Sequence, residues 1–341
     1  MRFYEVVLEQ LDLAAELLQE RHPMQSRLAL ILIDNAVEYS LHRYTTDYFK
    51  LHTIPGSLPV PERRKLYRKR AHASGRYIGP KIAFARRQSA VTEDQAVFVR
   101  HAHEFRNEAY HAGIAHDAII TQLATTYFSV FCEMLPKLAP RWMRFRFDQA
   151  LSNRVARHLA REAGTPMPDA EAIAASLMRV LPPLAAGLPG VCRESLADQL
   201  SDIRATIAYI IRNDSTVSGA DSLILETQFW NAFWSAAPVE GLTVRVDDGG
   251  VAEVHPAQKA EWEEALSQMR ATWSPKVSLR TLGRWEQRIA ALPQEKKQGI
   301  LLQKYQHLKS DMQPLSQMLS ERCGQLDQHI DELIERRALG R

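Results

Sequence analysis

The sequence predicts an all-α protein that contains one short β-hairpin. Residues that favour helices are plentiful and glycine is scarce, with 15 glycines in 341 residues. Apolar residues recur at helical spacing through most of the chain, as in helices that pack one face against a core. A near-heptad pattern between Leu301 and Leu333 continues this periodicity towards the end of the chain. The fold class therefore rests on composition and on periodicity.

The first region of the chain divides into helices separated by breaks. Predicted helices occupy residues 3–20, 26–50, 91–113 and about 117–137. In the second helix, apolar side chains at helical spacing are expected to face a core: Leu30, Ile33, Val37, Leu41, Tyr44 and Tyr48. Three prolines and a glycine in residues 53–61 break the chain after it. Thr92 and Gln95 stand at the spacing of a capping box and open the third helix. We expect residues 1–140 to form one helical domain.

Beyond Pro140 the character of the chain changes. The second region, residues 141–341, opens on a basic and aromatic connector and continues with three or four predicted helices. Residues 241–256 contain the one convincing hairpin, in which valines flank the turn sequence DDGG. The near-heptad pattern then predicts a coiled coil or a long helical pair, which Pro314 should kink or restart. This region would sense a trigger, bind a partner or hold a dimer together.

Composition excludes several classes of protein. Apolar residues make up 45% and charged residues 24% of the chain, which is typical of a globular protein. The three cysteines lie far apart without metal-type spacing and suit a reducing cytoplasm. Acidic residues interrupt the apolar N-terminal stretch, and no apolar run reaches the about 18 residues that a membrane span needs. We expect a cytoplasmic protein without secretory signal, membrane span, cofactor or metal.

The stretch EFRNEAYHAG, residues 104–113, places three polar side chains on an amphipathic helix. Asn107 and His111 are four residues apart, so their side chains can meet on one face. Arg106 lies about 140° around the helix from His111, because an α-helix has 3.6 residues per turn. One copy therefore makes no tight pocket. Two copies that cross at the alanines and glycine of this stretch would make one, which predicts a site across a twofold homodimer.

These residue types suit RNA cleavage without a metal. The reaction needs a base for the proton of the 2′-OH, an acid for the 5′-oxygen and a cation for the charged phosphate. Histidine titrates near neutral pH and serves as acid or base. Arginine presents a fork that matches phosphate oxygens, and a fixed cation is most effective where negative charge develops. Asparagine can orient a phosphate, a hydroxyl or the histidine ring.

The stretch RNEAYH resembles the R-polar-x3-H motif of the HEPN superfamily, small all-helical domains of bacterial toxins and phage-defence proteins. The resemblance covers about residues 1–138, with a long early helix and the motif helix near the end of the domain. Members with this motif usually act as metal-independent ribonucleases at a cleft between two protomers or two tandem domains. The resemblance implies that Arg106 and His111 are catalytic and that Asn107 is the polar motif residue. Gly113 stands where some members carry a modified tyrosine, so regulation at that position is not expected.

Three more side chains are candidates for supporting roles. Asp34 and Glu38 are i,i+4 neighbours beside the apolar run LALILI, where an acid is costly to bury unless it is paired. One of them, with Asp34 the stronger candidate, would anchor Arg106 or orient His111; otherwise both face solvent. His103 lies one turn before the motif asparagine and would line the same cleft or lie at its periphery. The histidine spacing matches no known metal-binding pattern.

Residues 62–90 form a basic segment, with ten cations against the single acid Glu62 and with aromatic side chains between them. Such a segment attracts a phosphate backbone and can stack bases. The alternative is a solvated loop and helix. The predicted RNA-binding residues are Arg63, Arg64, Arg68, Lys69, Arg70, Arg76 and Lys81.

Together these patterns predict a metal-independent endoribonuclease that cuts single-stranded RNA at a composite site of a homodimer. RNA and a second copy of the chain are the expected partners. The resemblance adds a toxin or anti-phage setting, with an antitoxin or a defence-system protein as a partner. One alternative is a non-catalytic module that binds a nucleotide, RNA or a partner. A second alternative is a DNA-binding regulator, although no helix-turn-helix pattern stands out.

Overall fold

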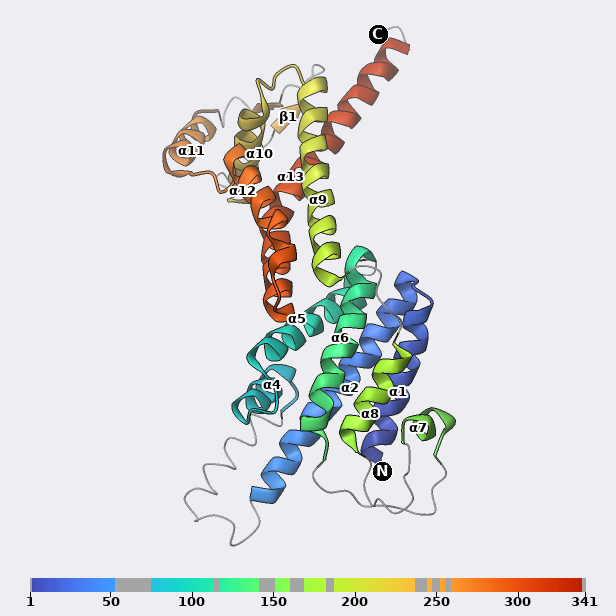
Figure 1. Ribbon diagram of the computed structural model, residues 1–341. Coiled ribbons are helices and arrows are strands. Elements are labelled where there is room, and N and C mark those ends of the chain that lie inside the picture. The colour runs from blue at the N-terminus through green and yellow to red at the C-terminus, as the bar shows by residue number, and fades with distance from the viewer. Residues whose placement is uncertain are drawn as a thin grey trace. The chain divides into compact units, whose positions relative to one another are not determined.

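The computed structural model describes residues 2–52, 75–112, 117–140, 151–159, 169–181, 187–236, 244–246, 252–254 and 259–338. These residues are almost entirely helical, which confirms the all-α class (Figure 1). The chain divides into two compact units. Unit 1 contains Met1–Ser195 and Leu292–Tyr305, and unit 2 contains Leu196–Ala291 and Gln306–Arg341. No helix within the described ranges has the length and apolarity needed to cross a membrane.

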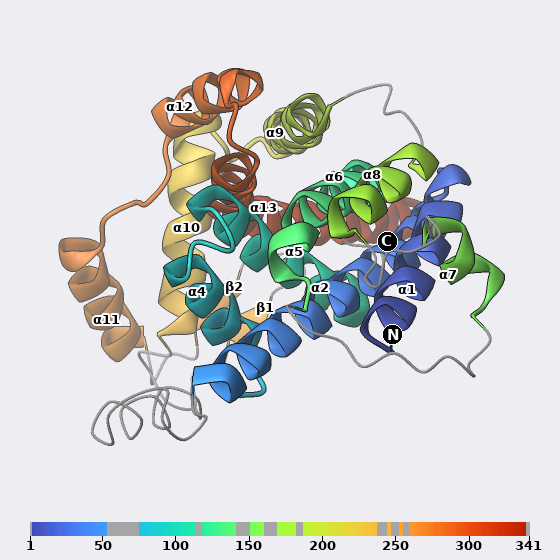
Figure 2. The ribbon, with the colours of Figure 1, turned by 60° about the horizontal axis from the view of Figure 1, so that its bottom comes forward.

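Unit 1 is a helical bundle. Its elements are α1 (Arg2–Gln19), α2 (Pro23–His52), α4 (Ile78–Arg87), α5 (Glu93–Ala112), α6 (Asp117–Leu138), α7 (Asn153–His158), α8 (Ala170–Val180), the beginning of α9 (Leu188–Asn213), the 3-10 helix η2 (Leu292–Gln294) and the beginning of α13 (Gln298–Ala338). Helix α2 packs against α1, α4, α5 and α6, and α8 covers α1 and α6 (Figures 1 and 2). The predicted core face of α2 is confirmed at Leu30, Ile33, Val37 and Leu41, which are fully buried. Tyr44 and Tyr48 are partly buried against Phe49 and Phe84.

Helix α5 begins as the sequence predicts. The backbone N–H of Thr92 donates to Gln95 Oε1 at 3.1 Å, and the N–H of Gln95 donates to Thr92 Oγ1 at 3.2 Å. This reciprocal pair is the predicted capping box, in which two backbone donors at the helix start find side-chain acceptors. Phe98, Ala102 and Phe105 are fully buried on one side of the helix. These three residues form the core-facing side of α5.

Helices α5 and α13 approach closely at Gly299. A carboxylate oxygen of Asp94, on α5, accepts the backbone N–H groups of Gly299 and Ile300 at 3.0 and 3.3 Å. Asp94 thus caps the N-terminus of α13, where free N–H groups favour a negative charge. Further along both helices, the rings of Phe105 and Tyr305 lie 5.9 Å apart. The beginning of α13 is therefore part of the packing of the motif helix.

Substituting Gly299 with alanine is expected to lower the free energy of unfolding. A Cβ atom at this position would lie 2.3 Å from the carbonyl oxygen of Asp94 and 2.8 Å from the backbone nitrogen of Phe98. Because both neighbours are backbone atoms, the two helices must move apart, and overpacking of this kind costs about 2–3 kcal/mol. Urea denaturation measures the loss. Gly324→Ala on the same helix is the matched control, since nothing lies within 4 Å of its added Cβ. Equal stability of the two variants would contradict the close approach.

Unit 2 contains the rest of α9 and α13, together with α10 (Ala220–Ser235), α11 (Lys259–Thr272) and α12 (Leu279–Ala290). Two short strands, β1 (Val244–Val246) and β2 (Ala252–Val254), pair antiparallel, with Val244 opposite Val254. The predicted DDGG turn of the hairpin lies outside the described residues.

Pro314 does not end the C-terminal helix. The near-heptad segment forms one helix from Gln298 to Ala338, so of the two predicted effects of this proline, a kink or a restart, the restart is wrong. Proline removes one intrahelical hydrogen bond, but Met312, Leu315 and Leu319 are fully buried around it. Burial on both sides of Pro314 holds the helix together despite the missing bond.

The observed division of the chain differs from the expected boundary near residue 140. Helices α7 and α8 come after that residue, yet they pack on α1 and α6 and belong to unit 1. Residues 292–305 return to the same unit from much later in the chain. The first compact unit is therefore larger than the 1–140 domain that the sequence predicts.

Candidate functional site

A fully buried carboxylate, Asp34, lies near the middle of α2. The hydroxyl of Tyr127, on α6, donates to its Oδ1 atom at 2.9 Å. Its Oδ2 atom lies 2.9 Å from Nδ1 of His103 and 3.4 Å from Nε of Arg106, both on α5. A buried acid is costly unless it is paired and hydrogen-bonded. Here Tyr127 and His103 supply hydrogen bonds, and Arg106 supplies a positive charge. Asp34 therefore joins α2, α5 and α6 at one point.

The guanidinium group of Arg106 is held from three sides. Its Nη1 donates to Asn107 Oδ1 at 2.9 Å and its Nη2 donates to Asn35 Oδ1 at 3.1 Å, while Nε faces Asp34. The Nε contact is ionic, because it lacks hydrogen-bond geometry. An arginine has five N–H donors, so one N–H on each terminal nitrogen has no partner among the described residues. The side chain is 24% exposed, which leaves those donors within reach of solvent.

We call these residues the Asp34 cluster: Asp34, Asn35, His103, Arg106, Asn107 and Tyr127. The hydrogen bond to Asp34 raises the pKa of His103 above its ordinary value, although burial and the charge of Arg106 oppose this. Burial, followed by the charge of Asp34, raises the pKa of Tyr127 well above its ordinary value. Tyr127 therefore stays a neutral donor, and His103 gains proton affinity from its partner.

The pairing of His103 with Asp34 is expected to stabilise the fold in acid more than in base. The pKa of His103 is raised in the folded chain, so this contribution is fully present below about pH 6.5 and is lost as the pH rises through the raised pKa. The measurement compares the free energy of unfolding of the wild type and His103→Gln over a range of pH. The difference should shrink with rising pH, and it should lose its pH dependence in an Asp34→Asn background. A difference that grows with rising pH would contradict the pairing.

Glu38 and Lys81 form a separate pair. The ammonium of Lys81, on α4, donates to Glu38 Oε1 at 2.8 Å and to the carbonyl oxygen of Arg76 at 3.3 Å. Glu38 therefore faces Lys81 and not Arg106, which leaves Asp34 as the acid that anchors the arginine. Lys81 is buried, so its position does not fit the expectation of an exposed RNA contact. The sequence did not show that the last lysine of the basic segment turns inward.

The other predicted residues are placed only in part. His111 lies in the last turn of α5, while its side chain is outside the described part of the chain. Arg76 is exposed. The remaining predicted RNA-binding residues lie outside the described residues: Arg63, Arg64, Arg68, Lys69 and Arg70.

Asn35 and Tyr127 are cluster residues that the sequence did not single out. Asn35 directly follows Asp34, so the dipeptide DN on an apolar helix was a signal that could have been used. Tyr127 stands in the apolar stretch TTYFSVF, where a tyrosine is indistinguishable from an ordinary core residue. Only the three-dimensional arrangement brings its hydroxyl to Asp34.

A second buried carboxylate, Asp12 on α1, was also missed. His158 Nε2 lies 2.7 Å from its Oδ1, and Arg154 and Arg157 contact its Oδ2. Burial raises the pKa of Asp12, but the hydrogen bonds from Arg157 and His158 outweigh it, and the net shift is downward. The other ring nitrogen of His158 lies 2.9 Å from the hydroxyl of Ser176 on α8. This cluster ties α7 and α8 to α1, which is a structural role.

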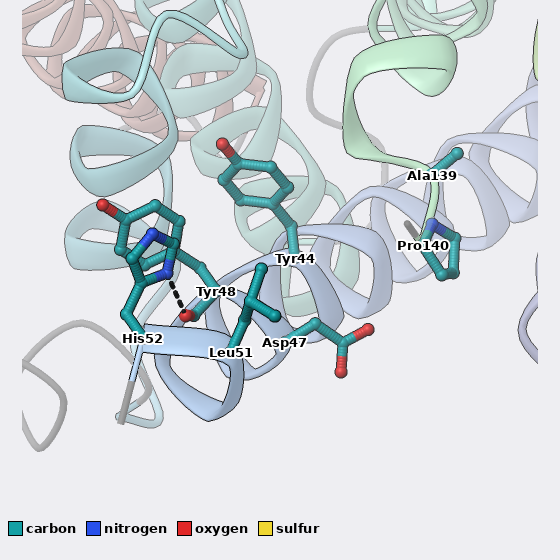
Figure 3. Close-up of a pocket in the computed structure, with 7 residues that line it drawn as sticks. All are labelled: Tyr44, Asp47, Tyr48, Leu51, His52, Ala139 and Pro140. Carbon is teal, nitrogen blue, oxygen red and sulfur yellow. Dashed lines mark hydrogen bonds between the residues drawn. The ribbon is translucent and has the colours of Figure 1, made fainter. Parts of the chain in front are cut away.

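A small cavity lies at the C-terminal end of α2 (Figure 3). It is lined by Tyr44, Asp47, Tyr48, Leu51, His52, Ala139 and Pro140. Its volume is about 30 Å³, which is room for a water molecule and too little for an organic substrate. The carboxylate of Asp47 binds Arg43 Nε at 2.6 Å through one oxygen, and its other oxygen has no hydrogen-bond partner within the described residues.

The Asp34 cluster therefore offers a positioned cation, a histidine oriented by a buried acid and two amide side chains. Such groups can bind a phosphate and move a proton. Nowhere in the described ranges do three His, Cys, Asp or Glu side chains come together as metal ligands. Comparison with family models, with characterised proteins and with solved structures finds no match to this chain.

Proposed function

We propose that this chain is a metal-independent endoribonuclease that cuts single-stranded RNA at a composite site formed by two copies of α5. The supporting observation is the fixation of Arg106 by Asp34, Asn35 and Asn107, with two N–H donors left for a phosphate. A guanidinium that is held before the substrate arrives is the arrangement that stabilises charge developing on a phosphate. His111 follows on the same helix, five residues after the arginine.

The proposed reaction is an intramolecular transesterification. A general base takes the proton of the 2′-OH, and the 2′-oxygen attacks the adjacent phosphorus. The bond from phosphorus to the 5′-oxygen breaks, and a general acid donates a proton to that oxygen. The products are a 2′,3′-cyclic phosphate and a free 5′-OH. His111 is the acid or the base, Arg106 binds the non-bridging oxygens, and Asn107 positions the substrate.

Two copies of the chain are needed for this site. Positions 106 and 111 are about 140° apart around an ideal α-helix, so we expect that a single copy does not bring both residues to the same phosphate. A twofold axis beside α5 would place Arg106 of one protomer near His111 of the other. The proposal therefore includes a cytoplasmic homodimer. It also includes a toxin or phage-defence setting in which an antitoxin or another defence protein is a partner.

The test compares the wild type with His111→Ala on labelled single-stranded RNA in the presence of EDTA. The wild type is expected to give fragments that end in a 2′,3′-cyclic phosphate, and the variant is expected to cleave about 100-fold more slowly or worse. His101→Ala is the matched control, because His101 lies on the same helix and contacts only the exposed Glu104 in the described ranges. Equal cleavage by wild type and His111→Ala would exclude the catalytic role.

The second candidate is a non-catalytic module that binds a nucleotide, RNA or a partner protein. The observation that favours it is the internal pairing of Arg106, since a buried acid alone is sufficient reason for an arginine at this position. This candidate predicts RNA binding without cleavage by either protein. A filter-binding assay beside the cleavage assay separates the two candidates.

A further inference from the structure

Unit 2 contains a groove of about 560 Å³ that is independent of the Asp34 cluster. Its lining residues come from α12, α13, the segment before α12 and Gln228 of α10; Figure 1 shows where these helices lie in unit 2. The volume falls in the range of about 300–1,000 Å³ that is usual for sites of small molecules. The lining contains apolar side chains as well as cations and side chains with hydroxyl groups.

The apolar part of the groove is built from Trp285, Pro314, Leu315 and Met318. Trp285 is 3% exposed and Leu315 is fully buried, so both are fixed by their packing in unit 2. A wall of this kind binds a flat, poorly hydrated ring system and does not bind an inorganic ion.

The cationic part of the groove contains Lys276, Arg284 and Arg288. Arg288 is paired with the single acid of the lining, Asp311, at 3.0 Å. Lys276 and Arg284 form no ion pair within the described residues, and Arg284 donates a hydrogen bond to Thr281 Oγ1 at 3.1 Å. The groove therefore keeps two positive charges, which favours a ligand with about two negative charges.

The backbone beside Lys276 is fixed by Gln228. The buried amide of Gln228 donates to the carbonyl oxygens of Ile224 and Val277 at 3.0 and 2.8 Å. Its Oε1 atom accepts the N–H groups of Lys276 and Val277 at 3.1 and 3.0 Å. The amide thus uses both donors and both lone pairs to hold this turn against α10. The turn that carries the lysine is already in place before a ligand binds, which improves affinity.

Pro314 adds a hydrogen-bond acceptor to the groove. Proline has no N–H, so the carbonyl oxygen of Ser310, four residues earlier on α13, lacks its usual helical donor. Ser310 and Pro314 both line the groove, as does Thr281. This part of the wall can accept hydrogen bonds from N–H groups at the edge of a ring.

We propose that this groove is a nucleotide-binding site. The base lies against Pro314 and Met318, two apolar lining residues that keep exposed surface, with its exocyclic N–H groups towards Ser310. The phosphate groups bind Lys276 and Arg284. A nucleotide combines the three features that the lining calls for: a flat ring, edge donors and at least two negative charges. The site is independent of the proposed ribonuclease activity.

Isothermal titration of the full chain with ATP, without divalent metal, tests the site. Lys276→Gln and Arg284→Gln are each expected to weaken ATP binding about tenfold, because each removes a charge that contacts phosphate. Both residues are exposed, so the variants are expected to fold, and circular dichroism verifies this. Arg280→Gln is the matched control on the same helix, since Arg280 does not line the groove. It should bind ATP as the wild type does.

Two further ligands test the two parts of the groove separately. Adenosine lacks the phosphates and tripolyphosphate lacks the base, so each is expected to bind more weakly than ATP. Absence of ATP binding to the wild type, or wild-type affinity in Arg284→Gln, would overturn the proposal. Tripolyphosphate binding as tight as that of ATP would overturn the assignment to a nucleotide and leave a phosphate site only.

Discussion

Replacing Asp34 with alanine is expected to lower the free energy of unfolding by about 4 kcal/mol, as removal of one partner from a buried ion pair does. Asp34 is fully buried and accepts the hydroxyl of Tyr127, which has no exposed surface of its own. Without the carboxylate, this hydroxyl loses its acceptor, and His103 and Arg106 lose their counter-charge. Urea denaturation measures the change.

Two variants show how much of the loss in Asp34→Ala comes from the carboxylate itself and how much from changes at neighbouring side chains. Asn35→Ala removes an exposed side chain at the next position and should change the free energy of unfolding by less than about 1 kcal/mol. Tyr127→Phe removes a single hydrogen bond and should cost about 1 kcal/mol. An Asp34→Ala protein as stable as Asn35→Ala would show that the carboxylate does not hold the three helices together.

Arg106→Ala is expected to slow RNA cleavage about 100- to 1,000-fold, provided that the proposed ribonuclease function is correct. The substitution removes the fixed cation that would face the phosphate in the transition state. Arg106→Lys should recover little of the activity, because an ammonium lacks the fork that donates to two oxygens. Single-turnover cleavage rates at a temperature where each variant is folded are the measurement.

Arg100→Ala is the control for the loss of a positive charge on the same helix. Arg100 is exposed and stands outside the Asp34 cluster, so its removal should leave the cleavage rate nearly unchanged. Similar losses in Arg100→Ala and Arg106→Ala would point to general attraction of RNA by α5 and not to a positioned catalytic group.

The sequence predicted which helices carry the Asp34 cluster and that its acid is paired, but not all of the contacts. Periodicity placed Leu30, Ile33 and Val37 in the core, and an acid between them had to be paired. That reasoning left Asp34 and Glu38 as alternatives, because spacing fixes the side of a helix and not its partner. In the structure the ammonium of Lys81 binds the carboxylate of Glu38, 43 residues earlier in the chain, so Asp34 is the acid that pairs with Arg106. No local pattern encodes a contact over that distance.

The extent of unit 1 was less predictable for a similar reason. The change of composition near residue 140 suggested a boundary, yet α7 returns to α1 through the buried pairing of His158 with Asp12. The two residues are separated by 146 positions in the chain, and each is unremarkable in its own segment. The need for glycine at position 299 was equally unpredictable, since only the approach of α5 shows why a side chain is excluded there.

The three partners of the Arg106 guanidinium also have a thermodynamic consequence. A free arginine side chain loses up to about 2 kcal/mol of rotational entropy when it is immobilised. In this chain that loss is incurred during folding, when Asp34, Asn35 and Asn107 fix the guanidinium. A bound anion would therefore meet a side chain with little disorder left to give up, and more of the attraction between them would be available as affinity.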